Sequence, residues 1–376
     1  TGVYIRKTNN ATLTNITAFD NEHGIAIENS GNVTISSSVA RNNAGHGFFL
    51  NNSEYNSISD SVATENGQSG FYLENSAYNT LSNVTAVSNE QNGIYLNHSY
   101  QNTIQNSLST KNTEYGFYLN NSSENQVSEN TASYNTFGYY LNNSDYNNSL
   151  FDNDALYNSN YGMYLLNSGF NNISGSNLSE NRYNFKMDGD DDTAFYQTIN
   201  NTNNLVDGKL ILYYNDTHNL VLDEQSNAGT VYIINGQNFT GNNLSLSDNG
   251  YGIYLRNTIE SNLTNISAFN NEDGIVLYNS SQNILDNNSA YDNLYSGIFL
   301  NSRSNSNLII NNTAYGNNVT GINLTGSSYN DLIENNAHNN HHGIVVQGGS
   351  NYNNLTANTA NSNSFYGIHI SDSEWN

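Results

Sequence analysis

The sequence predicts an all-β chain folded as a single-stranded, right-handed parallel β-helix of about 16 coils, with 21–24 residues and three short strands per coil. The first observation is a glycine-led apolar strand that recurs 17 times between Gly2 and Gly367, so that 365 residues cover 16 intervals of about 22.8 residues. The second is an Asn-rich turn after each such strand. A repeat this short cannot bury its own apolar face, so neighbouring repeats must stack.

Each repeat carries three strand signals. After the glycine, apolar residues alternate with other residues, as at Ile94 and Leu96, and this period of two is typical of a strand. A second strand has one apolar residue, and a third has a small residue, as in Ala63, Ala86, Ala132, Ala290, Ala314 and Ala337. Parallel crossovers are almost always right-handed, so we expect a right-handed helix.

Asparagines recur at two further positions of the repeat. One column contains Asn29, Asn52, Asn75, Asn121, Asn143, Asn167, Asn257 and Asn279, and the other contains Asn56, Asn79, Asn102, Asn125, Asn147, Asn283, Asn330 and Asn353. Asparagine tolerates left-handed backbone, and its amide can bond to the amides of adjacent coils. We therefore expect structural Asn ladders here in preference to a ligand site.

The repeat predicts one continuous domain over residues 1–376. Regular coils are expected over 1–185 and 229–376, and the part between them, 186–228, is expected to form degenerate coils with an acidic loop near 187–198. The spacing of the repeat continues through this irregular part, because the coil starts at 184, 208, 229 and 252 are 24, 21 and 23 residues apart.

The composition limits the partners. A net charge of −24, from 33 acidic and 9 basic side chains, opposes binding to nucleic acid and to anionic membranes. No run of 18 apolar residues occurs, so no membrane insertion is expected. There is no cysteine to form disulfides or thiolate metal sites. These features suit an extracellular or cell-surface protein.

The repeat resembles the β-helix repeats of the NosD-like and carbohydrate-binding/sugar-hydrolase families, which are abundant in archaeal surface proteins. A central stretch is similar to a NosD-like signature, through Asn204, Val206, Asp207, Gly208, Lys209, Tyr213, Tyr214, Ala228, Gly229, Val231 and Tyr232. Leu210 stands where that family has proline. The resemblance implies a surface or periplasmic β-helix and brings no catalytic motif with it. NosD itself is associated with copper-site maturation, but this chain has two methionines, Met163 and Met187, and no cysteine.

Aromatic residues form the most informative outward pattern. An aromatic stripe is expected two residues after the glycine, as a ribbon of ring faces made by Phe49, Tyr72, Tyr95, Tyr118, Tyr140, Tyr164, Tyr254 and Phe299. A second column would contain Tyr55, Tyr78, Tyr100, Tyr146, Phe170, Tyr329 and Tyr352. Such columns could stabilise the sheet, pack against another copy of the protein or bind a glycan.

Several polar groups are weaker candidates for chemistry. Glu129 and Asp152 fall on adjacent coils with Asp154 nearby, a spacing suited to a retaining glycosidase pair. Asp188, Asp190, Asp191 and Asp192 could bind calcium as a cofactor, although a solvated acidic loop is the simpler interpretation.

His338, His341, His342 and His369 lack the spacing of a metal site, and packing is favoured for them. About two dozen Asn-X-Ser/Thr sequons occur, and the glycosylation candidates are Asn15, Asn32, Asn83, Asn172, Asn238, Asn262, Asn318 and Asn354.

These features favour an extracellular structural protein of an archaeal-type cell surface. The chain begins and stops within a repeat without a cap, so we expect end-to-end and lateral contacts between copies, giving a filament, sheath or surface layer. A carbohydrate-binding or polysaccharide-cleaving module is the first alternative, and a periplasmic metal-delivery accessory protein is the second. An enzyme is the less favoured class.

Overall fold

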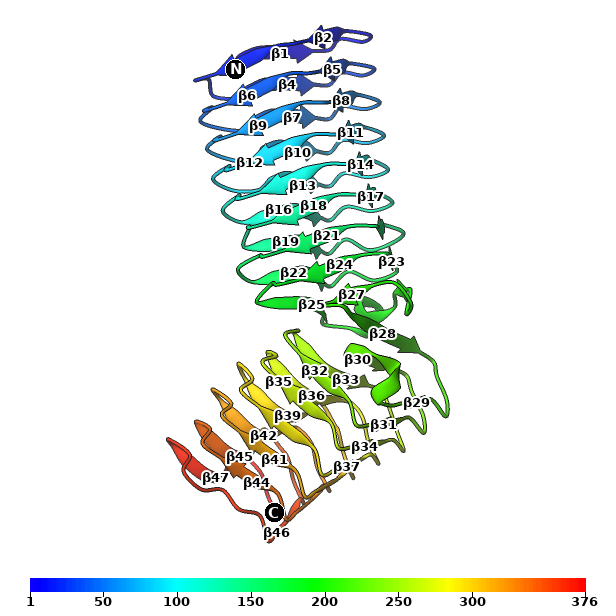
Figure 1. Cartoon of the computed structure of the whole chain (residues 1–376), viewed down its shortest axis with the longest axis vertical. Helices are drawn as coiled ribbons and strands as arrows, with labels where there is room; N and C mark the ends of the chain where they lie inside the picture. The colour runs from blue at the N-terminus through cyan, green and yellow to red at the C-terminus, as the bar shows by residue number, and fades with distance from the viewer. The chain divides into compact units, whose positions relative to one another are not determined.

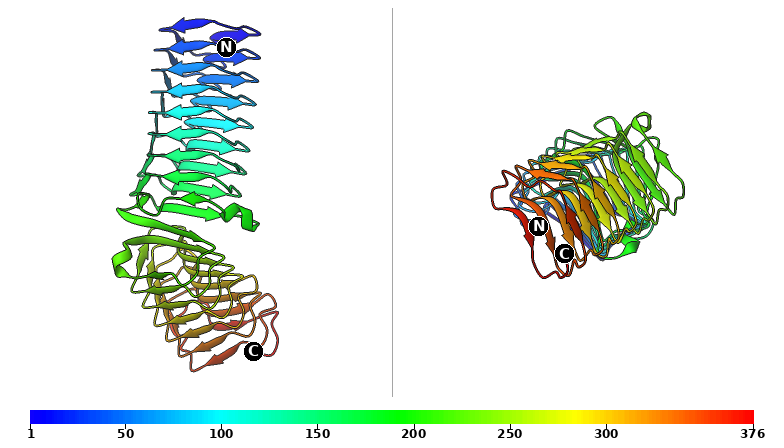
Figure 2. Two further views of the ribbon diagram at one scale, coloured as in Figure 1. Left: turned by 90° about the vertical axis from the view of Figure 1, so that its right-hand side faces the viewer. Right: turned by 90° about the horizontal axis from the view of Figure 1, so that it is seen from below.

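The computed structural model describes all residues 1–376 and divides into two compact units, Thr1–Asp207 and Gly208–Asn376. In each unit, three short strands per coil pair in parallel with the equivalent strands of the next coil (Figures 1 and 2). The predicted all-β solenoid with three strands per coil is confirmed. One continuous β-helix over 1–376 stays a prediction, since each unit is a β-helix by itself.

The first unit contains three parallel sheets. The first sheet consists of β1 (Val3–Arg6), β4 (Ile25–Glu28), β7 (Phe48–Asn51), β10 (Phe71–Glu74), β13 (Ile94–Asn97), β16 (Tyr115–Asn120), β19 (Phe137–Asn142), β22 (Tyr161–Leu166) and β25 (Tyr183–Asp188). The second consists of β2 (Thr12–Thr14), β5 (Thr34–Ser36), β8 (Ser57–Ser59), β11 (Thr80–Ser82), β14 (Thr103–Gln105), β17 (Gln126–Ser128), β20 (Ser149–Phe151), β23 (Asn172–Ser174) and β26 (Thr198–Ile199). The third consists of β3 (Thr17–Phe19), β6 (Val39–Arg41), β9 (Val62–Thr64), β12 (Thr85–Val87), β15 (Leu108–Thr110), β18 (Thr131–Ser133), β21 (Asp154–Leu156), β24 (Asn177–Ser179) and β27 (Leu205–Val206).

The second unit repeats this arrangement. Its first sheet consists of β28 (Lys209–Asn215), β30 (Ala228–Ile234), β33 (Tyr251–Arg256), β36 (Asp273–Tyr278), β39 (Ser296–Asn301), β42 (Thr320–Thr325), β45 (His342–Gln347) and β47 (Tyr366–Ile370). Its second consists of β29 (Val221–Leu222), β31 (Thr240–Asn242), β34 (Asn262–Thr264), β37 (Ile284–Asp286), β40 (Leu308–Ile310), β43 (Asp331–Ile333) and β46 (Asn354–Thr356). Its third consists of β32 (Ser245–Ser247), β35 (Ser267–Phe269), β38 (Ser289–Tyr291), β41 (Thr313–Tyr315) and β44 (Asn336–His338).

The expected irregular part holds the two 3₁₀ helices, η1 (Asp192–Phe195) in the first unit and η2 (Glu224–Ser226) in the second. Asp191 caps η1 by accepting hydrogen bonds from the backbone of Thr193 and Ala194. The acidic run is therefore a capped turn between β25 and β26, at the place where the sequence predicts a protruding loop.

The interior of each unit is a narrow apolar column. Alternate residues of the first strand point inward, and rings stack there, as Phe48 does on Phe71 with centroids 4.7 Å apart. The third strand contributes small residues: Ala63, Ala86 and Ala132 are fully buried. Apolar burial along this column is the main stabilising term of the fold.

The glycine that leads each coil lies at a crowded corner. A Cβ atom added to Gly70 would lie 2.8 Å from the carbonyl oxygen of Gly93, 2.9 Å from Nδ2 of Asn89 and 3.0 Å from Cβ of Ala86. The glycine, the small third-strand residue and the corner asparagine thus recur together because they share one tight space.

The corner asparagines form a hydrogen-bonded ladder. Oδ1 of Asn66 accepts from the backbone N–H and the side-chain amide of Asn43, at 3.2 and 2.9 Å. Nδ2 of Asn66 donates to Oδ1 of Asn89 at 2.9 Å and to the carbonyl of Ala40 at 3.1 Å. The same pattern continues to Asn112 and beyond, so each amide of this buried column is satisfied.

The two predicted asparagine columns have different roles. Asn56, Asn79, Asn102 and Asn125 form a second buried ladder of the same kind. The next member is Asn148, and the prediction of Asn147 was wrong, because the turn before β20 is one residue longer and Tyr146 and Asn147 both adopt left-handed backbone.

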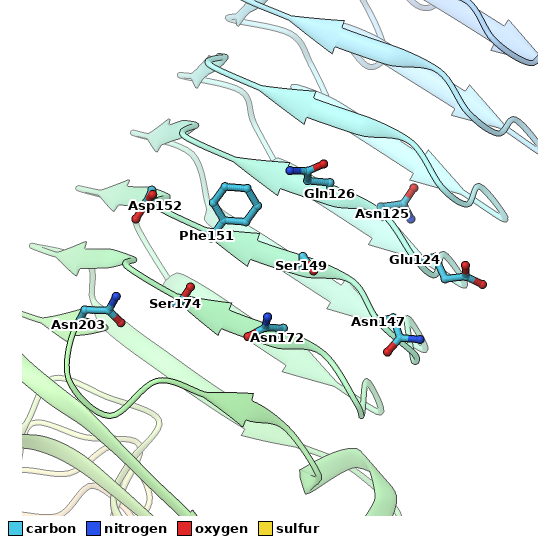
Figure 3. Close-up of a pocket in the computed structure, with 10 residues that line it drawn as sticks. All are labelled: Glu124, Asn125, Gln126, Asn147, Ser149, Phe151, Asp152, Asn172, Ser174 and Asn203. Atoms are coloured by element: carbon cyan, nitrogen blue, oxygen red, sulfur yellow. The ribbon is translucent and has the colours of Figure 1, made fainter.

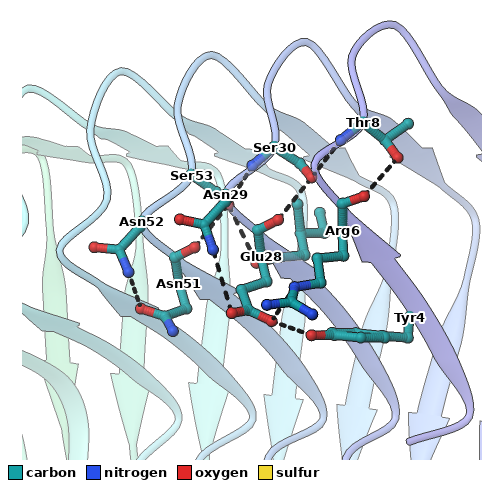
Figure 4. Close-up of polar contacts among 10 residues, drawn as sticks. Tyr4, Arg6, Thr8, Glu28, Asn29, Ser30, Asn51, Asn52 and Ser53 are labelled. Atoms are coloured by element: carbon teal, nitrogen blue, oxygen red, sulfur yellow. Dashed lines mark hydrogen bonds and ion pairs between the residues drawn. The ribbon is translucent and has the colours of Figure 1, made fainter.

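The other column, exemplified by Asn52 with φ 47°, is exposed and supplies the left-handed residue after each first strand. A serine follows this residue and makes a third ladder, which the sequence analysis missed (Figure 4). The hydroxyl of Ser30 accepts from the backbone N–H of Thr8 at 3.0 Å and donates to the carbonyl of Glu28 at 2.8 Å. Ser53 does the same for Ser30 one coil on.

Candidate functional site

The aromatic stripe lies on the outer face of the first sheet of the first unit. Rings of adjacent coils stack from Phe49 to Tyr164, with centroids 5.4, 4.8, 4.6, 5.2 and 5.4 Å apart along the column. A second column of rings, formed by the residue directly before the glycine of each coil, packs against the first. The ring centroid of His46 lies 4.6 Å from that of Tyr72, and the centroid of Tyr115 lies 4.7 Å from that of Tyr118. The result is a continuous aromatic surface on one sheet.

The stacked rings expose their edges and hydroxyl groups, because each ring is covered by its neighbours in the adjacent coils. The predicted ribbon of ring faces is therefore a ribbon of ring edges. Burial raises the pKa of Tyr95 to about 12 and also raises the pKa of Tyr118. These phenols are protonated at neutral pH, and the hydroxyl groups of Tyr72, Tyr95 and Tyr118 bond to Glu74, Asn120 and Asn142 beside the stripe.

The stripe does not continue through the second unit. Tyr254 pairs in register with Val276, which pairs with Phe299, and Phe299 pairs with Asn323. Rings adjoin one another only at the start of this column, where Tyr232 pairs with Tyr254 and Tyr251 stacks on Tyr254 at 4.7 Å. Beyond Tyr254, aliphatic and amide side chains separate the rings. An unpredicted column takes its place on the third sheet, where Phe269, Tyr291, Tyr315 and His338 stack at 5.0, 4.9 and 5.3 Å. Its sequence signal is an aromatic residue directly after the third-strand alanine.

The second predicted aromatic column lies at the turn between the first and second strands and is more exposed. Tyr55 and Tyr78 stack at 4.8 Å and are 55% and 40% exposed. Further along this turn Tyr146 stacks on Phe170 at 5.3 Å, and in the second unit Tyr329 stacks on Tyr352 at 5.1 Å.

His46 is the most perturbed histidine of the aromatic surface. Its ring stacks on His23 at 5.3 Å, and its Nδ1 accepts the backbone N–H of Ser69 at 3.2 Å. Burial, and secondarily the charge of His23, lower the pKa of His46 to about 4. If Nδ1 of His46 were protonated, its N–H would face the backbone N–H of Ser69, and the hydrogen bond between them would be lost.

This shift predicts a loss of stability in acid. Between pH 6.5 and about 4, His46 binds a proton in the unfolded chain but not in the folded protein. The free energy of unfolding is therefore highest above pH 6.5 and decreases towards pH 4, by up to about 3 kcal/mol. Replacing His46 by Phe, as Phe137 occupies the equivalent place, should remove this part of the pH dependence in urea unfolding at pH 7, 5.5 and 4.

A matched control is His98→Asn, because His98 lies at an exposed left-handed turn where Asn75 and Asn121 stand in other coils. This variant should keep the wild-type pH dependence. If the free energy of unfolding fell equally between pH 7 and pH 4 in the wild type and in the His46 variant, the lowered pKa of His46 would not be the cause of the acid sensitivity.

A shallow hollow lies over the second sheet of the first unit (Figure 3). Asp152 lines it, and Glu129 does not, although the two residues occupy equivalent left-handed positions on adjacent coils. Asp154 belongs to β21, where burial raises its pKa. The remaining lining residues are Glu124, Asn125, Gln126, Asn147, Ser149, Phe151, Asn172, Ser174 and Asn203.

The acidic run is engaged in local contacts. Asp188 forms an ion pair with Lys186 at 3.3 Å, Asp190 accepts from Asn167 at 3.2 Å, and Asp191 caps η1. No group of three or more His, Asp or Glu residues is arranged to hold a metal ion. Calcium binding at Asp188, Asp190, Asp191 and Asp192 stays a prediction.

The histidines of the second unit do not fit a copper site. His342 and His369 stack at 6.3 Å with an interplanar angle of 26°, so the lone pairs in their ring planes do not converge. His341 contacts Ser364 through Nδ1 at 2.9 Å. Met163 and Met187 are fully buried in the apolar column of the first unit.

All eight predicted glycosylation candidates are exposed, and none of the buried ladder asparagines begins a sequon. In the ladder that contains Asn56 the reason is the period of two, because the residue two positions after the asparagine points inward, as Ile58 does, and is therefore apolar. Their modification stays a prediction. No helix in the structure is long and apolar enough to cross a membrane.

The fold and its surface define a β-solenoid with hydrogen-bonded Asn and Ser ladders. Residues 1–150 and 69–225 match the family described as the right-handed β-helix region, together 225 of 376 residues, so the chain belongs to the right-handed β-helix family. Residues 211–376 match the family described as periplasmic copper-binding protein (NosD), which confirms the NosD-like resemblance for that part. The predicted right-handed sense is likewise confirmed.

No curated protein sequence matches the chain. Among solved structures, it is similar to the A-module of the mannuronan C-5 epimerase AlgE6 from Azotobacter vinelandii, with 12% identity, 97% of this chain and 91% of that chain covered, and a TM-score of 0.32. It is also similar to a variant of the periplasmic alginate epimerase AlgG (12% identity, 93% and 77% covered, TM-score 0.30). The catalytic unit of a GH87 α-1,3-glucanase from Streptomyces thermodiastaticus matches at 9% identity, with 91% and 63% covered and a TM-score of 0.27. Values this low carry no inference about activity.

Proposed function

We propose that the protein is an extracellular structural protein of an archaeal-type cell surface, and that copies associate laterally through the exposed aromatic turn of the first unit. The description of the NosD family as periplasmic supports export. The ladders support a rigid structural role, because they satisfy buried amides and hydroxyls in coil after coil.

The observation that carries the proposal is the conformation of the exposed rings. Tyr55, Tyr78 and Phe170 have φ values of 59°, 55° and 55°, in a left-handed region that bulky residues rarely adopt. Asn32 and Gln101 adopt the same conformation at equivalent places, so the coil does not need a ring there. Exposed rings that the fold does not require are typical of a contact surface.

The test is assembly of the full chain, followed by sedimentation velocity and electron microscopy. We expect linear or sheet-like assemblies whose formation increases with NaCl, because screening weakens the repulsion between copies of net charge −24. Replacing Tyr55 and Tyr78 by Asn together should reduce the assembled fraction at least fivefold, by roughly 1 kcal/mol of contact energy.

Tyr4→Asn is the control, since Tyr4 is 54% exposed but lies on the first sheet, away from this turn. A monodisperse monomer at all salt concentrations would refute the proposal. Unchanged assembly of the double variant would refute the assigned surface.

A further inference from the structure

The hollow in Figure 3 contains an aromatic ring that differs from the stacked columns. Phe151 makes no contact with another ring, and its register partners on the adjacent coils are Ser128 and Ser174. Such small neighbours cannot cover the ring faces as tyrosines cover one another in the stripe. Phe151 is therefore an outward ring of this unit whose faces are free of stacked rings.

The coil does not require a ring at this place. The equivalent outward residues on the other strands of the sheet are Thr14, Ser36, Ser59, Ser82, Gln105, Ser128 and Ser174. Only Phe151 among them is apolar, so its presence needs a reason other than folding.

Three of the amide side chains around Phe151 are not engaged within the protein. The side chains of Gln126, Asn172 and Asn147 line the hollow and make no hydrogen bond to other protein groups. Some outward amides elsewhere bond to their neighbours, as Asn120 does to Asn97 at 2.8 Å. The hollow thus combines an uncovered ring with amide donors and acceptors that are free to bind a ligand.

The dimensions of this array suit a sugar. Gln126, Ser149 and Asn172 follow one another on β17, β20 and β23, so the array spans two strand spacings, or about 10 Å, with Phe151 about 7 Å along the strand. This area matches the size of one or two pyranose rings. The aromatic face of Phe151 would contact their C–H groups, and the amides would form hydrogen bonds with their hydroxyl groups.

The charges favour a neutral ligand. Glu124 and Asp152 are the charged lining residues, and no Lys, Arg or His is present to hold a carboxylate or sulfate. The two carboxylates also stand at opposite ends of the second strand, roughly 16 Å apart along the chain direction. This separation exceeds the distance between the carboxyl groups of glycosidase pairs, so the hollow supports binding in preference to cleavage.

We propose that the hollow around Phe151 binds the hexopyranose units of a neutral glycan chain, with Phe151 stacking on the sugar and with Gln126 and Asn172 binding its hydroxyls. Phe151, Gln126 and Asn172 lie on the strands β20, β17 and β23 and not on the exposed rings that we assign to lateral assembly, so either proposal can fail alone.

The experiment is titration of the full chain with cellohexaose, mannohexaose and, as an acidic comparison, hexaguluronate, followed by saturation-transfer NMR and calorimetry. The protein is produced in a host without N-glycosylation, because Asn172 begins an Asn-Ile-Ser sequon. We expect millimolar binding of a neutral hexaose, reduced about tenfold by Phe151→Ala and retained by Phe151→Trp.

Two further variants keep the test decisive. Gln126→Ala together with Asn172→Ala should weaken binding without removing an apolar group. Tyr55→Ala, which removes an exposed ring on a coil distant from the hollow, should leave binding unchanged. Binding of neither neutral hexaose, tighter binding of hexaguluronate, or full binding by a folded Phe151→Ala variant would overturn the proposal.

Discussion

Replacing Asn66 by Asp is expected to lower the melting temperature by about 6–12 °C, the equivalent of about 3 kcal/mol in a unit of this size. The change keeps the shape of the side chain but removes both amide donors. A carboxylate oxygen would then face Oδ1 of Asn89 and the carbonyl of Ala40, which now accept at 2.9 and 3.1 Å. Buried acceptors without donors, and a buried charge, both oppose folding.

Asn42→Asp is the matched control, because it makes the same chemical change one coil earlier at an exposed position. Asn42 has φ 52°, and Asp20 already occupies the equivalent left-handed place with φ 56°. This variant should melt within about 1 °C of the wild type, as expected for a surface substitution. Equal losses in the two variants would show that added charge, and not the ladder, is responsible.

Replacing Gly70 by Ala is expected to cost about 2–3 kcal/mol, measured as a lower urea midpoint at unchanged slope. The new Cβ would contact the carbonyl of Gly93 at 2.8 Å and Cβ of Ala86 at 3.0 Å, both fixed by the sheets. Because these neighbours are backbone and a short side chain, the coils must separate locally to admit a methyl group.

Gly31→Ala is its control, since Ala77 occupies the equivalent position two coils further on. A Cβ atom at Gly31 would lie 3.1 Å from the carbonyl oxygen of Glu54 and 3.3 Å from Oδ1 of Asn9, which is the end of a side chain that can move aside. We expect little change or a small gain in stability, because alanine restricts the unfolded chain. A loss as large as that of the Gly70 variant would contradict the crowded-corner interpretation.

The features predicted well from the sequence are those that recur with the repeat. The glycine spacing, the alternating apolar residues and the small third-strand residue correspond to register-paired positions, so each prediction was supported by many coils at once. Asn147 was assigned wrongly because the turn before β20 holds an extra residue, which a fixed spacing cannot accommodate. The Ser ladder was missed because serine is common throughout this chain, so a serine that recurs after the left-handed residue does not by itself indicate a buried hydroxyl group.

The candidate site depends on features that do not recur. Phe151 is one ring in a polar column. The repeat length places Ser128 and Ser174 beside it, but only the stacked coils bring Gln126, Asn147 and Asn172 together around it. The orientation of the stripe's rings also depends on the tertiary structure. The sequence spacing places Phe49 to Tyr164 in one column, but the ring edges face outward only because rings of adjacent coils stack on one another.

The sequence by itself therefore determined the solenoid, its three strands per coil and the identity of its core, because a period of about 23 residues can bury apolar side chains only by stacking. The tertiary structure decided which asparagines are buried in ladders, which are left-handed turns, and which amides and rings stay uncommitted. Those distinctions depend on contacts between residues about 23 positions apart on neighbouring coils, and such contacts exist only after the coils have stacked.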